Sequence, residues 1–298
     1  GAPDLALTQV LVETFSLVLF VLVLRMLPQD FRRRPRSGRR SRRRLWRLAL
    51  AGTMGAAIST LTVVAANARI HEPISKAFPE QAYDFGHGQN VVNVTLVDIR
   101  AWDTLGEISV LVAAATGIAS LVFVRTQDVE RSWTRRRNQG PVTASIPRER
   151  RSVILETATR LVFHVMIALS LYLLFSGHNQ PGGGFAGGLV LGLALLVRYL
   201  AGGRAELDRA APVSAGLVLG AGLVVAALSA LAPLAFGGTV LQSAVVEFDV
   251  PVWGHVKLVT AMFFDIGVYL IVIGLALDVV RSLGAGVDKQ AEEDGATA

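Results

Sequence analysis

Several ionisable side chains of this sequence lie in or at the ends of long apolar runs. A charged group inside a membrane costs at least about 2.5–3.5 kcal/mol on insertion scales, so each such residue needs a partner, a cavity or a role. Carboxylates in apolar surroundings can bind and release protons or hold a cation. The candidates for an ion path are Glu13, Asp103, Glu107, Glu156, His164, Lys257 and Asp265.

The first three carboxylates each leave two interpretations open. Glu13 lies in the first apolar run, where it either carries protons or forms a hydrogen bond with one of the neighbouring subunits. Asp103 and Glu107 are spaced i, i+4, so they face the same way on a helix, and Asp103 stands where a helix N-cap would be. Glu107 lies a turn deeper and is the better functional candidate, unless Asp98 and Arg100 hold it in a structural ion pair.

A second polar stripe consists of Glu156, Arg160 and His164 at i, i+4 and i+8. Glu followed by Arg at i+4 forms a good intrahelical pair. His164 either relays protons near neutral pH or makes a hydrogen bond between helices. The stripe as a whole favours a polar path in the interior.

The last apolar run contains Asp265 in its middle and His255 and Lys257 near its start. If this run is one helix, Lys257 and Asp265 are two turns apart and share a face that Tyr269 continues. Asp265 then takes part either in a structural ion pair with a neighbouring helix or in ion handling.

The stretch Ser176–Gly188, which reads SGHNQPGGGFAGG, contains six glycines between two apolar runs. Proline and glycine do not continue a helix comfortably, so we expect a tight outer turn. Gly187, Gly188 and Gly192 then provide a small-residue face for close helix packing. The turn's motif residues at the outer mouth are His178, Asn179, Gln180, Pro181 and Phe185.

Composition decides which elements must position these residues. The chain has 298 residues, is 52% hydrophobic and only 17% charged, and has a mean hydropathy of +0.49. These values indicate an all-α polytopic membrane protein, because about 20 apolar residues in a helix cross the hydrocarbon layer. Seven spans are predicted, at about 5–27, 45–66, 103–124, 153–175, 184–202, 213–236 and 254–280.

The basic residues indicate the orientation of these spans. Nine arginines lie between residues 32 and 44 and seven between 131 and 151, whereas 176–183 and 237–253 contain no Lys or Arg. By the positive-inside rule the N-terminus is outside and the C-terminus cytoplasmic. The net charge of +6 is therefore a topology signal, and no nucleic acid partner is expected.

We expect no enzyme active site, cofactor or metal centre. The chain contains no cysteine, which excludes disulfides and thiolate ligands, and it has no catalytic triad or phosphate loop. The histidines, which are scattered along the sequence, are His71, His87, His164, His178 and His255.

Three motifs resemble parts of one known family. GHNQPGGGFAGG followed by LVLGLALLVRYLAGG is similar to the signature of the B subunit of the Mrp/Mnh-type multisubunit Na+/H+ antiporter, and the likeness covers about 150–283. GAPDLALTQVLVE at 1–13 and NVVNVTLVDIRAWDTLGEI at 90–108 resemble the C-terminal extension of its A subunit. Relatives of these modules also occur in membrane-bound hydrogenases.

The resemblance implies a three-helix A-like module at 1–130 and a four-helix B-like module at 150–283. Charge and composition predict a basic cytoplasmic linker at 131–149 and a disordered acidic tail at 284–298. Because the chain begins without Met, we expect a piece of a longer polypeptide. The resemblance also implies a multi-pass protein of a bacterial cell membrane, partnered by other antiporter subunits and the lipid bilayer.

In such a complex, cytoplasmic Na+ would exchange for external protons. Two alternatives stay open. The first is a membrane-arm subunit of a redox-driven ion pump such as a hydrogenase, and the second is a structural scaffold whose charges only hold helices together. The identity of the neighbouring subunits would distinguish the redox pump from the antiporter. Substitution of the carboxylates would distinguish the scaffold from a subunit that carries ions.

Overall fold

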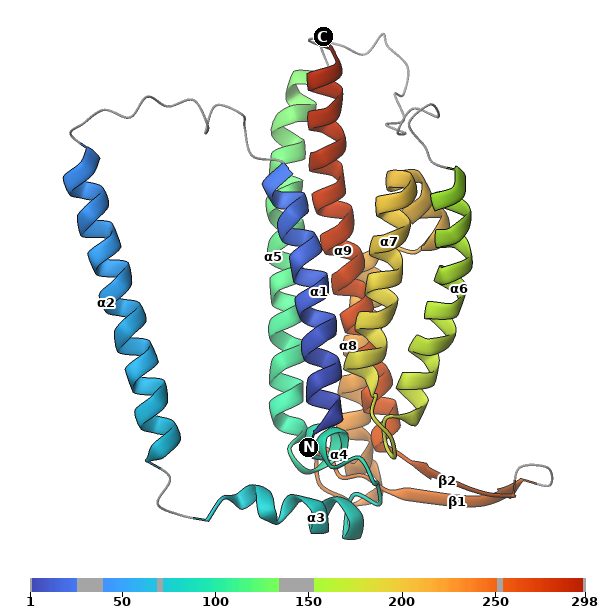
Figure 1. Cartoon of the computed structure of the whole chain (residues 1–298). Coiled ribbons are helices and arrows are strands. Elements are labelled where there is room, and N and C mark those ends of the chain that lie inside the picture. Colours follow the sequence, from blue (N-terminus) through green and yellow to red (C-terminus); the bar gives the residue numbers. More distant parts are fainter. Residues whose placement is uncertain (1, 26–39, 69–71, 134–152, 251–253, 297–298) are drawn as a thin grey trace. The chain divides into compact units, whose positions relative to one another are not determined.

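The computed structural model describes residues 2–25, 40–68, 72–133, 153–250 and 254–296. They form mainly helices (Figure 1). The α-helices are α1 (Pro3–Arg25), α2 (Arg40–Asn67), α3 (Phe78–Asp84), α4 (Val91–Val94), α5 (Ala101–Trp133), α6 (Val153–Ser176), α7 (Gly184–Ala210), α8 (Ala215–Leu231) and α9 (Ala261–Ala296).

Six helices of the described part are long and apolar enough to cross a membrane. They correspond to six of the seven predicted spans, and the prediction at 103–124 falls on α5. The exact number of spans and their orientation stay predictions. Short helical turns complete the chain: η2 (Ile74–Lys76), the π-helical η3 (Thr95–Ile99) and η5 (Ala232–Phe236), which extends α8.

The expectation of an all-α fold with a helix from 254 is wrong at one place. Residues Val245–Val250 (β1) and Gly254–Val259 (β2) form an antiparallel hairpin, in which Glu247 is opposite Lys257. The segment His255–Leu258 alternates polar and apolar side chains, which is the period of a strand. α9 therefore begins at Ala261, and Lys257 does not share a helix face with Asp265.

The other end of α9 also departs from expectation. The helix continues to Ala296, through most of the tail predicted to be disordered at 284–298. Its alanine, glutamate, lysine and glutamine residues favour a helix. The predicted linker at 131–149 lies almost wholly outside the described residues, so the division into an A-like and a B-like module stays a prediction.

By contacts the chain divides into two units, residues 27–77 and the remainder. The first unit contains α2, whose span-length apolar segment has no buried residue. In the other unit α9 packs against α7, α8, α5 and α1, and α6 packs against α7 (Figure 1). α7 and α9 are the most buried helices among the described spans and form the centre of the core.

Glycine lets these helices approach closely, as the sequence predicts for α7. A Cβ at Gly188 would lie 2.8 Å from Cβ of Val272, and one at Gly192 would lie 2.8 Å from Cβ of Ala276. Between α8 and α9, a Cβ at Gly222 would lie 2.8 Å from the backbone oxygen of Gly267. Real side chains do not tolerate such distances, so small residues set the spacing between these helices.

A buried ion cluster joins α6 to the far end of α7. The helix departs from helical geometry at Gly203, where φ is 70°. Beyond it the Glu206 side chain is 2% exposed and lies 3.1 Å from Arg160, 3.2 Å from Arg198 and 2.8 Å from Arg209. Arg160 thus reaches a carboxylate on another helix. The side chain of Glu156, its predicted partner, lies outside the described residues.

We predict that Gly222→Leu destabilises the chain by about 1–3 kcal/mol, because the added side chain forces α8 and α9 apart. The free energy of unfolding of the purified chain in mixed micelles measures the effect. Gly220→Leu is the matched control on the same helix, since a Cβ at Gly220 meets nothing within 4 Å. Equal losses in both variants would contradict close packing at Gly222.

We also predict that Glu206→Gln costs about 3 kcal/mol, because it leaves three arginines around an uncharged group. This is the lower end of the range for breaking a buried pair, since Arg160 and Arg209 are half exposed or more. Asp208→Asn removes a half-exposed partner of Arg281 and serves as the control, with a loss of at most about 1 kcal/mol. The same unfolding titration compares the two.

Candidate functional site

The turn between α6 and α7 requires glycine at two positions. The backbone N–H of Gly183 donates to the carbonyl oxygen of Leu173 at 2.8 Å, which folds the chain back on α6. Gly183 has φ 99°, and a Cβ at Gly182 would lie 2.4 Å from the Leu173 oxygen. The predicted tight turn is present, and its glycines follow from backbone geometry.

The polar residues beside the glycines connect this turn to the segment before α4. The side-chain amide of Asn90 donates to the carbonyl oxygens of Gly177 at 2.7 Å and Gln180 at 2.8 Å. The imidazole Nε2 of His178 lies 2.9 Å from the carbonyl oxygen of Gly86. Tyr172 donates its hydroxyl hydrogen to the Gln180 side chain at 2.8 Å. His178 and Gln180 thus fix the turn against its neighbours.

Two buried carboxylates accept hydrogen bonds from the same turn. Asp265 is 4% exposed, and its oxygens accept from the Gly184 backbone at 2.7 Å and the Asn93 side chain at 3.3 Å. Asp4 is also 4% exposed and accepts from the Gly182 backbone at 2.8 Å. Residues from α1, α4 and α9 therefore converge on the start of α7.

One helical turn further along α9, Tyr269 continues the face of Asp265 as predicted. Its hydroxyl oxygen lies 2.9 Å from that of Ser170 on α6. The Ser170 hydroxyl also donates to the carbonyl oxygen of Gly187 at 2.7 Å. This network joins the three helices directly below the turn.

The other predicted ion-path residues lie on the surface of the chain. Glu13 is exposed on α1 and accepts a hydrogen bond from Gln9. Asp103 and Glu107 are exposed on α5, where Asp103 pairs with Arg100. A continuous path through them stays a prediction that would need neighbouring subunits.

His164, Lys257 and Phe185 lie apart from that group. His164 is exposed on α6, and its Nδ1 lies 2.7 Å from the carbonyl oxygen of Arg160. Lys257 lies 3.6 Å from Glu247 on the hairpin. Phe185 is 39% exposed at the start of α7.

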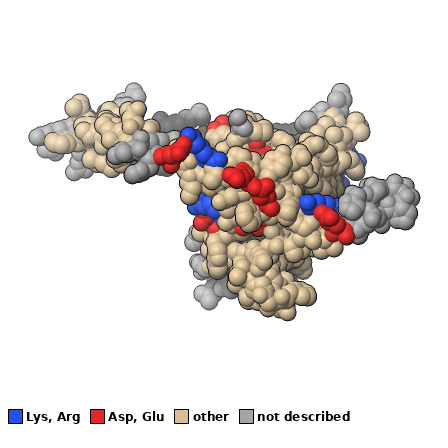
Figure 2. All heavy atoms as spheres, turned by 90° about the horizontal axis from the view of Figure 1, so that it is seen from below, with Lys and Arg blue, Asp and Glu red and all other residues tan. Residues whose placement is uncertain are grey.

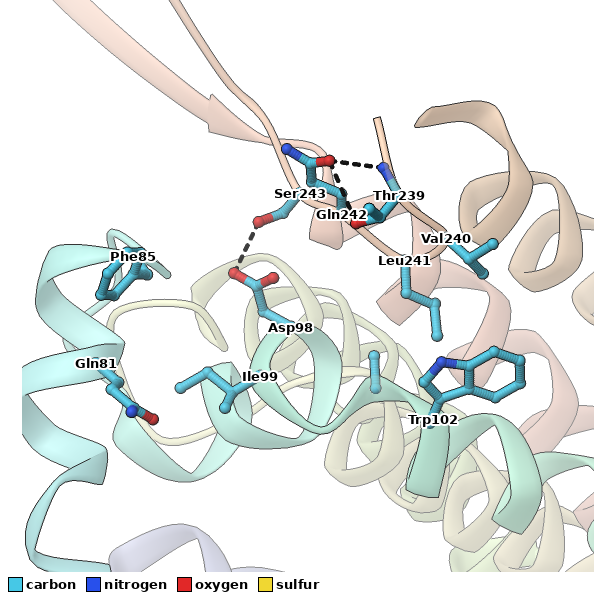
Figure 3. Close-up of a pocket in the computed structure, with 11 residues that line it drawn as sticks. Gln81, Phe85, Asp98, Ile99, Trp102, Thr239, Val240, Leu241, Gln242 and Ser243 are labelled. Carbon is cyan, nitrogen blue, oxygen red and sulfur yellow. Dashed lines mark hydrogen bonds between the residues drawn. The ribbon is translucent and has the colours of Figure 1, made fainter. Parts of the chain in front are cut away.

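A cavity of about 530 Å³ opens beside this site, between η3, α3 and the loop before β1 (Figure 3). Its polar centre is Asp98, which accepts a hydrogen bond from Ser243 at 2.7 Å. Burial raises the pKa of the Asp98 carboxyl, against that hydrogen bond and the nearby His178. Burial lowers the pKa of His178 below its ordinary value.

A smaller cavity of about 80 Å³ leads to Asp265. Asn93, His178, Asn179 and Lys257 line it together with apolar residues. Figure 2 views this end of the molecule, where acidic and basic side chains lie in a few small groups among uncharged residues. Buried Asp265 is thus connected to a polar cavity, although it lies on an apolar helix.

Sequence reasoning did not single out Asn90, Asn93 or Glu206. Asn90 caps α4, and its side-chain oxygen accepts from the Asn93 backbone at 3.3 Å. An Asn ahead of a short apolar run is an N-cap signal, which could have identified Asn90 from the sequence. No local pattern predicts that Asn93 faces Asp265, 172 residues away.

Family models match three consecutive parts of the chain. Residues 154–278 match the domain related to the MnhB subunit of Na+/H+ antiporter. Residues 41–137 match the E subunit of MBH, and residues 1–29 match the D subunit of MBH.

Individual relatives agree with this division. The chain is 34% identical over 296 residues to the A/B subunit of a probable K(+)/H(+) antiporter of Rhizobium meliloti (strain 1021), covering 95% of this chain and 30% of that protein. It is 39% identical over 132 residues to the B subunit of the Na(+)/H(+) antiporter of Bacillus subtilis (strain 168), covering 44% of this chain and 92% of the relative.

Two solved structures are similar in fold. A chain of the Mrp complex from Dietzia sp. DQ12-45-1b has a TM-score of 0.73 and 33% identity, over 95% of this chain and 30% of that one. A chain of the membrane-bound sulfane sulfur reductase, an archaeal respiratory membrane complex, has a TM-score of 0.50 and 26% identity, over 82% of this chain and 97% of that one.

The chain spans only 30% of the A/B relative and of the Mrp chain that it matches. It nevertheless covers nearly the whole of the Bacillus B protein, and its three matched parts follow the predicted order. The predicted resemblance is confirmed: the chain belongs to the Mrp-type antiporter family, with the sequence of a fused A/B subunit.

Proposed function

We propose that this chain is part of a multisubunit membrane complex that exchanges a monovalent cation for protons. The observation that carries the proposal is the 39% identity to the B subunit of a Na(+)/H(+) antiporter over 92% of that relative. The specific reaction proposed is uptake of external protons against export of cytoplasmic Na+. The relative named for a K(+)/H(+) antiporter makes K+ the other cation to test.

The surface of the chain supports a role inside a larger assembly. Large apolar side chains are exposed along α1 and α6, among them Leu17, Phe20 and Leu161 at 60–72%. In a membrane, such faces are covered by lipid or by the helices of other subunits. We propose that neighbouring subunits of the same complex cover part of them.

This arrangement gives the exposed carboxylates a role at contacts between subunits. Glu13 and Glu107 have exposed side chains in the isolated chain. They lie on the long helices α1 and α5, of 23 and 33 residues. A carboxylate at such a position needs a polar partner from outside the chain. We propose that these two residues pass protons or cations along the boundary with other subunits.

The alternative function is that of a membrane-arm subunit in a redox-driven pump. The likeness to a chain of the sulfane sulfur reductase, over 97% of that chain, favours this alternative. The protein composition of the purified complex separates the two, because a redox pump also contains iron–sulfur subunits.

We predict that the complex purified from its native membrane, once in proteoliposomes, collapses an imposed pH gradient when Na+ or K+ is added. A pH-sensitive dye inside the vesicles reports proton flux, and choline is the control cation. Mass spectrometry and iron analysis of the same preparation identify its subunits. Iron–sulfur subunits together with flux that requires electron transfer would support the redox alternative instead.

We further predict that Glu107→Gln lowers cation-dependent proton flux at least about tenfold. Proton transfer to or from one positioned side chain contributes about 10²–10⁴-fold to a rate, and Gln cannot take up the proton. Glu13→Gln tests the second position in the same assay. Asp84→Asn, an exposed carboxylate outside the spans, is the control. Normal assembly and unchanged flux in both Glu variants would leave only the structural scaffold.

A further inference from the structure

Two buried carboxylates from opposite ends of the chain meet at one glycine turn. Asp4 binds the backbone N–H of Gly182, and Asp265 binds that of Gly184, at 2.8 and 2.7 Å. Only Gly183 separates the two amides. Both aspartates are 4% exposed. Two carboxyl groups are therefore held on one turn in an apolar surrounding.

The hydrogen bonds of the chain do not satisfy both groups. Among the described residues, the second oxygen of Asp4, Oδ2, is buried and has no hydrogen-bond partner. A buried ionised oxygen without a partner is unfavourable, so native proteins pair such atoms or bind a cation to them. The turn donates only one backbone N–H to each carboxylate, and the Asn90 amide near Asp4 already donates to the carbonyl oxygens of Gly177 and Gln180. This leaves a demand for positive charge.

Other oxygen atoms gather at the same point. A Cβ at Gly183 would lie 2.3 Å from Asn93 Oδ1 and 3.3 Å from Asp265 Oδ2. The Asn93 Nδ2 donates to that Asp265 oxygen, so the amide directs its own oxygen toward Gly183. Because Gly183 has no side chain, an amide oxygen and a carboxylate oxygen can both pack close to its backbone. Hard cations prefer ligands of these two kinds.

The cavity of about 80 Å³ lies beside two of these residues, Asn93 and Asp265. It reaches Asn93 and Asp265 and has room for water or a partly hydrated ion. Its other polar lining comes from His178, Asn179 and Lys257. An ion could therefore reach Asp265 without crossing the apolar core.

The charged and titratable groups around the aspartates do not supply the missing positive charge. Lys257 on β2 lines the cavity but pairs with Glu247, and its side chain is 42% exposed. His178 on the turn uses its Nε2 toward the Gly86 carbonyl oxygen and is buried in a way that disfavours its charged form. Asp4 on α1 and Asp265 on α9 thus keep excess negative charge.

We propose that Asp4 Oδ2, Asp265 Oδ2 and Asn93 Oδ1 form a binding site for one monovalent cation against the Gly182–Gly184 turn. The cation would neutralise one of the two buried charges and complete the shell of Asp4. The choice of a monovalent ion rests on the proposed function; the oxygen site itself does not.

A hydrophobic carbodiimide tests the proposal on the unaltered complex, purified in detergent and kept in choline buffer. The reagent modifies protonated carboxyl groups, so a bound cation protects them. At a Na+ or K+ concentration ten times the dissociation constant, modification of Asp4 and Asp265 slows about tenfold. Peptide mass spectrometry quantifies both sites. Asp278, a partly buried carboxylate near the middle of α9, also has an unpartnered oxygen, but the positive charge of Arg281 lies beside it; it is the internal control and keeps its rate.

Asp4→Asn replaces one carboxylate oxygen of Asp4 with an NH2 group and removes its negative charge. This variant should abolish the protection of Asp265. Asp84→Asn should leave that protection intact. Modification that does not respond to Na+ or K+ would overturn the proposal, because the pair would then only share a proton. Protection by Ca²⁺ alone would overturn it as well.

If the reagent reaches neither aspartate, equilibrium binding of radioactive Na+ and of radioactive K+ decides. The wild-type complex then binds one more ion than the Asp4→Asn complex. If the two complexes bind the same number of Na+ ions and also the same number of K+ ions, the proposal is overturned. Transport in the same preparation separates this inference from the proposed function. Cation-dependent proton flux without protection of the aspartates would support the antiporter function and overturn the cation site. Protection without flux would support the site and contradict the antiporter function.

Discussion

The hydrogen bonds between the Gly182–Gly184 backbone and two buried aspartates are the interaction on which the rest of this structure depends. The first amides of a helix have no partner within the helix, and in an apolar surrounding each needs an acceptor. Asp265 accepts from the first residue of α7, and Asp4 accepts from the turn just before it. These bonds bring α1 and α9, at opposite ends of the sequence, to the start of one helix.

The same constraint explains the residues around the turn. Asn90 binds two turn carbonyls, His178 contacts the Gly86 oxygen, and Ser170 with Tyr269 joins α6, α7 and α9 one level below. Polar groups of a membrane helix end are costly when unpaired, so partners come from every neighbouring element. The family motif is therefore a set of mutual hydrogen bonds, with glycine wherever the backbone approaches too closely for a side chain.

Charge is distributed differently at the two ends of α7. At the turn, two aspartates lie against backbone amides with no cationic side chain bonded to them among the described residues. Near Ala210, a single buried glutamate is surrounded by three arginines from two helices. One end thus carries excess negative charge and the other excess positive charge. At the turn, a cavity also reaches Asp265.

The sequence by itself determined the class of the protein, the approximate helices, the turn and the family, because length, apolar content and glycine spacing are local properties. It also identified Asp265 as a deeply placed carboxylate. It did not reveal the hairpin at 245–259, because a short apolar run there resembles the start of the next helix. Only the tertiary structure paired Asp4 with Gly182, Asn93 with Asp265 and Arg160 with Glu206. Each of these pairs joins residues distant in sequence, and their meeting is decided by how the helices pack.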